Sequence, residues 1–228
     1  MLFQPKKYSL RALFGSISSI GQWHALRTYA LSQYDWISSR RTRTSTAFGA
    51  PIPWWSYSAT SVIDQIVSTA GSVLEIGSGN STLWWLNRGN SVLAIETSEQ
   101  WADSIRESAG VDPNLELIIH PLDSVDKLQL LPAERRFDVL HIDHTGDRSD
   151  AIRRFLPHLS EHGVLIVDNT DREEYRSSLV DLVDQGYSRL DFFGIGPINA
   201  YCWQTTLFFK QETLKTLGRP QSFASVAY

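Results

Sequence analysis

At 228 residues, with 42% hydrophobic and 20% charged residues, the chain is long enough to bury the core of one domain with an extension. No apolar run approaches the roughly 20 residues of a membrane-spanning helix, and the single cysteine, Cys202, excludes an internal disulfide and suits a reducing compartment. Residues 1–45 carry seven Lys or Arg and one Asp, a net charge of +6; because the total is −4, the remaining chain carries −10, which argues against nucleic acid as a general partner.

The first 50 residues read as a helical extension with a connector. Apolar residues from Leu10 to Ile20 recur at helical spacing, which predicts an amphipathic helix. Residues 38–53 are polar, basic and contain Pro and Gly, which is typical of a connector. We therefore expect an extension at 1–50 and a main domain at 51–228.

The basic charge of residues 1–45 allows three partners: the acidic body of the same protein, an acidic partner or second subunit, or an anionic membrane surface. The start of the chain has two lysines before a mildly apolar run. Arg11 interrupts that run and no small-residue cleavage site follows, so a secretion signal is not favoured. We expect a cytoplasmic protein, with membrane association as the alternative.

The main domain alternates short apolar strands with helices. The predicted strands are 72–77, 91–96, 115–120, 137–143 and 163–169, and the helices between and after them are 81–89, 98–110, 124–131, 149–159 and 172–186. Two further strands, 187–193 and 201–210, are joined by too few residues for a helical crossover and should be antiparallel. This order predicts an α/β fold with a mainly parallel sheet covered on both faces.

Ligands of such sheets bind at the carboxyl ends of the strands, near the point where strand order reverses. Polar residues gather at those predicted ends: 77–81, 96–97, 120–123, 143–145 and 168–170. The chemistry of the protein is therefore expected at this edge.

The loop Gly77-Ser-Gly-Asn-Ser81 follows the first strand of the domain. The two glycines let a ligand approach the backbone, and Asn80, Ser81 and Thr82 open a helix whose first N–H groups are free. Thr82 stands where a dinucleotide fingerprint would want a third glycine, and the Lys of a phosphate-binding Walker loop is missing.

Two acidic residues complete this pattern. Glu75, inside the strand, would repel a pyrophosphate but attract an α-amino group, and Glu96 ends the next strand, where a carboxylate can accept from both ribose hydroxyls. An ammonium partner, a glycine loop and a ribose clamp together describe S-adenosylmethionine (SAM). The alternative is a tight turn beside two solvated acids.

With these residues in place, residues 54–210 resemble a class I SAM-dependent methyltransferase. The resemblance implies a Rossmann-like, doubly wound sheet of seven strands closed by an antiparallel pair. The segments "PWWSYSATSVIDQIV" and "FFGIGPINAYCWQTTLFFK" resemble a bacterial family of predicted methyltransferases linked to carbohydrate or secondary-metabolite biosynthesis. The cofactor-binding residues that it implies are Trp55, Tyr57, Glu75, Gly77, Gly79, Asn80, Ser81, Glu96, Thr97, Leu122, Asp123 and Asp143. Trp55 has an alternative role as a core anchor.

A second group of polar residues predicts a metal. Asp143, Asp168 and Asn169 end two strands that should be neighbours, and their oxygens suit Mg²⁺. The Asp-His and Asp-Asn pairs resemble those of catechol O-methyltransferases, where they hold the metal; Gly146, however, stands where that family has a catalytic Lys. The alternative is that Asp143 orients SAM without a metal, while Asp168 and Asn169 cap a helix or contact the acceptor.

His144, just beyond a strand end, is the preferred candidate for the base that removes a proton from the acceptor, with Asp143 beside it as the second catalytic residue. His120 is a weaker rival, and His141, inside the strand, reads as a packing residue. Arg148 reads as a surface partner of Asp147 or as a holder of an anionic acceptor group.

We therefore expect a class I SAM-dependent methyltransferase that methylates oxygen on a small hydroxylated acceptor, such as a sugar, glycolipid or secondary metabolite, with Mg²⁺ assistance. Two alternatives stay open: a metal-independent N- or O-methyltransferase, and a SAM-binding accessory subunit without activity of its own. Methyl transfer to an acceptor distinguishes the last from the others.

Overall fold

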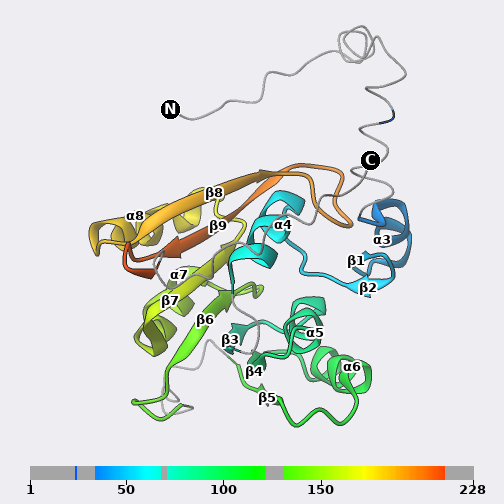
Figure 1. Ribbon diagram of the computed structural model, residues 1–228, viewed down its shortest axis with the longest axis horizontal. Coiled ribbons are helices and arrows are strands. Elements are labelled where there is room, and N and C mark those ends of the chain that lie inside the picture. The colour runs from blue at the N-terminus through cyan, green and yellow to red at the C-terminus, as the bar shows by residue number, and fades with distance from the viewer. Residues whose placement is uncertain (1–23, 25–33, 68–70, 122–130, 214–228) are drawn as a thin grey trace, which may run out of the picture.

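The computed structural model describes residues 24, 34–67, 71–121 and 131–213. The helix predicted between Leu10 and Ile20 lies outside these residues, as do Leu122, Asp123 and all but the last residue of the helix predicted at 124–131. The described part is a seven-stranded sheet with helices on both sides, and a small hairpin stands beside one end of it (Figure 1).

The sheet has the strand order β5-β4-β3-β6-β7-β9-β8. Its strands are β3 (Ser72–Ile76), β4 (Ser91–Glu96), β5 (Leu115–Ile119), β6 (Phe137–Ile142), β7 (Leu159–Asp168), β8 (Ser188–Gly194) and β9 (Trp203–Phe209). The first five run parallel, and β9 pairs antiparallel with both β7 and β8. The predicted α/β fold, with its closing antiparallel pair, is confirmed. Strand order reverses between β3 and β6, so their carboxyl ends form the expected ligand edge.

The helices have recognisable ends. They are α3 (Trp36–Thr42), α4 (Tyr57–Ile66), α5 (Asn80–Asn87), α6 (Glu99–Ala109), α7 (Arg148–Phe155) and α8 (Arg176–Asp184), with short 3-10 turns at Leu156–His158 and Glu173–Tyr175. The Ser98 side chain caps α6 by accepting from the Trp101 N–H, and Asp147 caps α7 in the same way. Gly110 follows α6 with a φ of 66°, a conformation that glycine adopts without strain.

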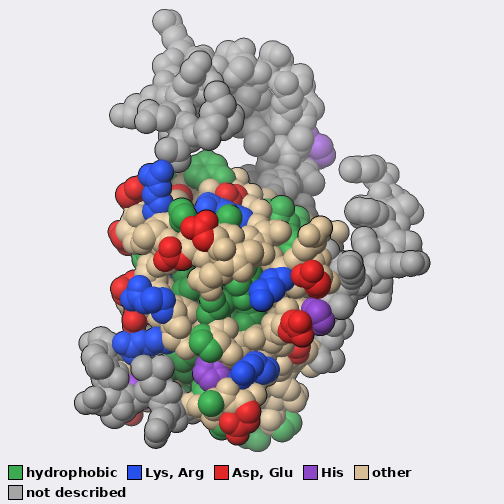
Figure 2. Space-filling view, turned by 90° about the vertical axis from the view of Figure 1, so that its left-hand side faces the viewer, with side chains coloured by type: hydrophobic (Ala, Val, Ile, Leu, Met, Phe, Trp, Pro, Cys, Tyr) green, Lys and Arg blue, Asp and Glu red, His purple; other side chains and the backbone are tan. Residues whose placement is uncertain are grey.

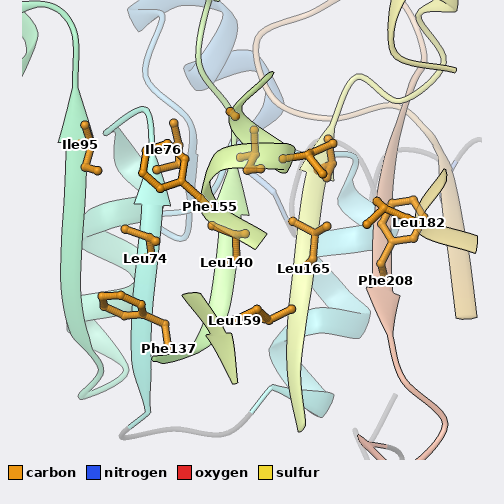
Figure 3. Packing of buried hydrophobic residues seen from close by; sticks show 14 of the residues in the cluster. Leu74, Ile76, Ile95, Phe137, Leu140, Phe155, Leu159, Leu165, Leu182 and Phe208 are labelled. Carbon is orange, nitrogen blue, oxygen red and sulfur yellow. The ribbon is translucent and has the colours of Figure 1, made fainter. Parts of the chain in front are cut away.

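Two apolar layers hold the sheet. Residues of one parity, such as Leu74, Leu140 and Leu165, pack with Phe155 of α7 and Leu182 of α8 (Figure 3). Residues of the other parity pack with α4, α5 and the tryptophans of the second layer, which are Trp55, Trp84 and Trp85. Because side chains alternate along a strand, β3, β4, β6, β7 and β9 each supply residues to both layers. Both faces are therefore buried, which accounts for the nearly continuous apolar runs in the sequence.

The segment expected as a connector contains regular structure. It forms α3 and a hairpin of β1 (Thr46–Ala47) and β2 (Ala50–Pro51). The ring of Tyr34 stacks on that of Tyr57 at 4.0 Å, and both Tyr34 and Ile52 belong to the second apolar layer. Contacts of residues 34–52 therefore cross the predicted boundary at residue 50, and the boundary itself stays a prediction.

The surface of the described residues carries both signs of charge. On the face shown in Figure 2, acidic and basic side chains are interspersed. Several ion pairs of the described residues have both side chains exposed, such as Arg106–Asp103 and Arg176–Glu173, and exposed pairs add little stability. Within the described ranges, no helix is long and apolar enough to cross a membrane.

The loop between β8 and β9 lies at the ligand edge and packs tightly against the segment before α4. The Tyr57 N–H donates to the Ile195 carbonyl at 2.8 Å. A Cβ placed on Gly196 would lie 2.3 Å from the Trp55 carbonyl oxygen and 2.4 Å from the Trp203 ring. Only glycine fits at this position without a shift of its neighbours.

Gly196→Ala should therefore destabilise the protein by about 1–3 kcal/mol, the usual cost of overpacking. Gly194→Ala is the matched control, because a Cβ there would meet only the Ser58 hydroxyl, at an ordinary 3.6 Å. Urea unfolding of the two variants measures the difference; equal stabilities would show that the loop yields to the added methyl group.

Candidate functional site

The carboxyl ends of β3 and β6 meet at Gly77. Its φ of +93° suits glycine, and a Cβ there would lie 2.3 Å from the Asp143 carbonyl oxygen. The Asp143 N–H in turn donates to the Ile76 carbonyl. Gly77 thus lets the two strand ends close together at the reversal of strand order. Gly79, by contrast, has an extended backbone, and a Cβ there would meet only the Ser81 hydroxyl, at 3.7 Å, so its lack of a side chain leaves room for a ligand.

Glu75 is fully buried and ties the glycine loop to the sheet. Its carboxylate accepts hydrogen bonds from the hydroxyls of Ser81 and Thr82, the latter at 2.5 Å, both in the first turn of α5. It also contacts Nδ1 of His141 at 2.9 Å. Glu75 and His141 are directly opposite one another on β3 and β6, so their side chains share one face. In the described structure Glu75 therefore holds the loop through these bonds, and its predicted contact with the cofactor stays a prediction.

His141 extends this network to Trp55. The Trp55 indole N–H donates to His141 Nε2 at 2.9 Å. Since an indole nitrogen can only donate, Nε2 must accept, and the imidazole proton lies on Nδ1, facing Glu75. Trp55 and Tyr57 are both 0% exposed. The described arrangement thus gives both aromatic residues packing roles, and their predicted contact with the cofactor stays a prediction.

Glu96 ends β4 and is also held by several donors. One carboxylate oxygen accepts from the N–H of Ser78 at 2.8 Å and from its hydroxyl at 3.0 Å. The other accepts from the N–H groups of Thr97 and Ser98 at 2.8 and 2.9 Å. Glu96 therefore joins the glycine loop to the start of α6. A ribose hydroxyl would reach this carboxylate in place of the Ser78 hydroxyl, which can rotate away.

The segment that precedes the main domain contacts helix α5, which follows the glycine loop. The Asn80 side-chain amide donates to the Ser45 carbonyl at 2.6 Å. Asn80 is the first residue of α5, so this bond fixes the start of the helix to the hairpin region. No pattern in the sequence predicts this contact, because residues 38–53 carry no periodicity that pairs them with the loop.

His144 follows Asp143 and is almost buried. Its Nδ1 accepts from the Gly146 N–H at 2.9 Å, which places the imidazole proton on Nε2, and Nε2 is buried without a partner among the described residues. Burial, together with the Arg148 charge, lowers the pKa of His144 from 6.5 to about 4. His144 thus presents a neutral N–H donor. To take a proton from the hydroxyl of the methyl acceptor, His144 would have to carry its own proton on Nδ1. It would then lose the hydrogen bond from the Gly146 N–H.

Asp168 is buried inside the sheet edge. One of its carboxylate oxygens accepts from the Trp203 indole at 3.0 Å and from the Thr205 hydroxyl at 2.5 Å. Burial and the Asp143 charge raise the pKa of Asp168 from 3.8 to about 7. Asn169 follows with a φ of 55°, an uncommon conformation that asparagine tolerates. Sequence reasoning did not identify Trp203 or Thr205 as partners of Asp168, because they lie 35 and 37 residues away.

Arg148 is the residue whose place differs most from expectation. The sequence predicts a surface partner of Asp147 or a holder of an anionic acceptor group, but Asp147 caps α7 and Arg148 is 4% exposed. Its guanidinium donates to the Asp143 carboxylate at 2.7 Å, to the His144 carbonyl at 3.0 Å and to the Asp168 carbonyl. An arginine cation therefore lies between the two predicted metal-binding acids.

The residues do not fit the predicted Mg²⁺. The cation needs ionised oxygens turned toward one point, whereas an Asp143 oxygen is paired with Arg148 and an Asp168 oxygen faces Trp203 and Thr205. Across the described part of the chain, no group of three or more His, Cys, Asp or Glu could hold a metal ion. Magnesium thus has no support in this arrangement.

The two shifted pKa values predict opposite effects of pH on stability. The folded state holds the Asp168 proton more tightly than the unfolded chain, so that contribution is present below about pH 4 and is lost as the pH rises toward 7. The folded state resists protonation of His144, so that contribution is present above pH 6.5 and is lost as the pH falls toward 4. In the wild type the two contributions therefore change the free energy of unfolding in opposite directions as the pH rises.

Asp168→Asn should therefore make the free energy of unfolding rise more steeply with pH, between pH 4.5 and 6.5, than it does in the wild type. His144→Asn should make the free energy of unfolding rise less steeply, or fall, over the same range. Each change is limited to about 1.4 kcal/mol per pH unit for one proton. Urea unfolding at three pH values measures the slopes. Parallel slopes in all three proteins would contradict the opposed shifts.

Comparison with known proteins agrees with this geometry. Residues 74–170 match the family described as Methyltransferase domain. A relative in Staphylococcus carnosus, described as an uncharacterized methyltransferase, is 29% identical over 146 residues, which cover 59% of this chain and 63% of the relative. The chain thus spans less than two thirds of that relative's length.

Solved structures show the same fold. A proposed O-methyltransferase from Klebsiella pneumoniae has a TM-score of 0.50 and 22% identity, covering 62% of this chain and 74% of its own. Fibrillarin from Aeropyrum pernix, in complex with natively bound SAM, has a TM-score of 0.50 and 15% identity, covering 62% and 67%. These likenesses show that the chain has the same Rossmann-like fold, and the family match places a resemblance to methyltransferase domains over residues 74–170 of it.

Proposed function

We propose that this protein transfers the methyl group of SAM to an oxygen of a small hydroxylated acceptor, such as a sugar, a glycolipid or a secondary metabolite. The observation that carries the proposal is the glycine loop at the end of β3. Hydrogen bonds to the carboxylates of Glu75 and Glu96 fix the shape of this loop. The family match over residues 74–170 supports the reaction class. The likeness to the proposed O-methyltransferase from Klebsiella pneumoniae supports oxygen as the atom methylated.

In this proposal, different residues at the carboxyl edge of the sheet bind different parts of the cofactor. The open backbone at Gly79 and the first N–H groups of α5 would receive the polar end of the cofactor, and Glu96 its ribose. SAM supplies an electrophilic methyl group when bound. The chain contributes mainly by aligning the acceptor with that methyl group, which accounts for much of the rate in a displacement reaction.

Two residues face the acceptor's hydroxyl in this proposal. The Nε2–H of His144 is a buried donor without a partner in the described structure, and it can hold an oxygen of cofactor or acceptor. The Asp143 carboxylate, partly exposed at the strand end, can accept a hydrogen bond from the attacking hydroxyl. Asp143 rather than His144 offers an acceptor oxygen here, because the His144 tautomer presents an N–H.

Calorimetric titration of the purified chain with SAM and with S-adenosylhomocysteine tests the cofactor assignment. We expect saturable binding of both. Methyl-labelled SAM is then incubated with panels of sugars, glycolipids and phenols. Label on an acceptor oxygen supports the proposal, label on nitrogen redirects it to amine acceptors, and cofactor binding without transfer would favour the accessory subunit. A complete lack of SAM binding would end the proposal.

The role of Glu96 can be separated from its role in the loop. Glu96→Gln should weaken SAM binding by about 1.5–3 kcal/mol, because charge-assisted bonds to the ribose are lost. Ser78→Ala is the matched control: it removes the competing hydroxyl and leaves the carboxylate and the Ser78 N–H in place. That variant should bind SAM as well as the wild type or better. If both variants lose affinity equally, Glu96 acts only through the loop.

A further inference from the structure

The Arg148 guanidinium is enclosed by acceptors from two strand ends. It donates to the carboxylate of Asp143 and to the carbonyl of His144, both just beyond β6, and to the carbonyl of Asp168, at the end of β7. The Tyr175 ring centroid lies 5.9 Å away and covers another side. With a side-chain exposure of 5%, the cation has little contact with solvent.

The position of Arg148 in its helix is unusual. It is the first residue of α7, where the positive end of the helix dipole disfavours a cation. Burial adds a further cost, because a charge removed from water must be paired and fully hydrogen-bonded. Asp143 provides the opposite charge at 2.7 Å, and the two carbonyl groups occupy other donors. These acceptors therefore offset the cost of holding the Arg148 cation between the ends of β6 and β7.

We infer that Arg148 supplies, from within the chain, the positive charge that catechol-type methyltransferases obtain from a divalent metal at these two strand ends. The inference rests on the proposed function. Arg148 is a positioning residue: it orients the Asp143 carboxylate and ties β6 to β7, and it leaves no place for a second cation. Methyl transfer by this protein then needs no added metal.

Arginine suits this task better than lysine. The guanidinium is a rigid fork of donors that can reach three acceptors in different directions, and it stays charged when buried. An ammonium group is a single point on a flexible stem. A substitution by lysine therefore keeps the charge but cannot reproduce the three directed bonds.

The first experiment needs no variant. The full chain is freed of metal with EDTA, dialysed and titrated with Mn²⁺ while electron paramagnetic resonance records the free ion. We expect no saturable binding, and the same SAM affinity with and without Mg²⁺. Saturable Mn²⁺ binding that Mg²⁺ displaces would overturn the inference. These readouts do not depend on turnover, so they distinguish its failure from a failure of the proposed function.

The second experiment compares arginines of one helix. Arg148→Met keeps the apolar stem but removes the cation. Arg153→Met is the control, because Arg153 has a side-chain exposure of 65% and its ion pair in the described structure is with Asp150 on the same helix. We expect Arg148→Met to lower the melting temperature by about 10 °C, because it leaves a partly buried charge unpaired. Arg153→Met should match the wild type.

Turnover gives the decisive split between positioning and mere stability. Once an acceptor is known, Arg148→Lys, assayed well below its melting temperature, should lower kcat at least roughly tenfold while the Kd for SAM stays unchanged. EDTA should leave wild-type turnover intact. Loss of wild-type turnover in EDTA with rescue by Mg²⁺, or full kcat in Arg148→Lys, would contradict the inference.

Discussion

The buried carboxylate of Glu75 is the group on which the ligand edge depends. An ionised or polar group with no solvent contact must have its hydrogen bonds satisfied inside the protein. Glu75 meets this demand with Ser81 and Thr82 from α5 and with His141 from β6. The same bonds fix the first turn of α5 and therefore the shape of the glycine loop. The cost of burying one acid thus determines the geometry of the site.

The network reaches both sides of the edge. From Glu75 it passes through His141 to Trp55, whose carbonyl lies against Gly196 in the loop between β8 and β9. The glycine loop and the β8–β9 loop are far apart in sequence, but they are joined by one buried chain of polar and close-packed contacts. Both loops therefore pack against the same buried groups, which have no contact with solvent.

A second buried group, centred on Arg148, does the same for β6 and β7. It differs from the first because it pairs the Arg148 cation with the Asp143 carboxylate, and removal of either partner would leave the other charge unpaired. The two groups lie on either side of Asp143 in the sequence, with His141 in one and Arg148 in the other. The short stretch from His141 to Arg148 therefore contributes residues to both buried groups at the edge.

The fold and the position of the glycine loop could be predicted because their signals are local. Apolar strands, intervening helices and the glycines at 77 and 79 occur in order along the chain. The hairpin of β8 and β9 followed from the short loop between them. The burial of Arg148 could not be predicted, because an arginine beside Asp147 at a helix start has the same local sequence whether it faces water or the sheet. Its partner carbonyl at Asp168 is 20 residues away and becomes a neighbour only through the pairing of β6 with β7.

The predicted metal site is not supported by the structure, and the reason again lies in partners that are distant in the sequence. Asp143, Asp168 and Asn169 do follow neighbouring strands, as the pattern indicated, but proximity of oxygens does not give convergence. The partners that turn Asp168 away, Trp203 and Thr205 on β9, come from the antiparallel strand, whose register no local pattern specifies. Side-chain direction at a strand end is decided by such distant partners.

The bond between Asn80 and Ser45 has a consequence for how this protein can change over evolution. Its acceptor is a main-chain carbonyl, which every amino acid possesses, so the bond constrains the path of the chain at residue 45 and not the residue type. Substitutions could accumulate along that segment without loss of its hold on α5, as long as the backbone keeps its course. An insertion or deletion would be much less tolerated, because it would move the carbonyl away from Asn80. Homologues should therefore vary in the composition of this segment more freely than in its length.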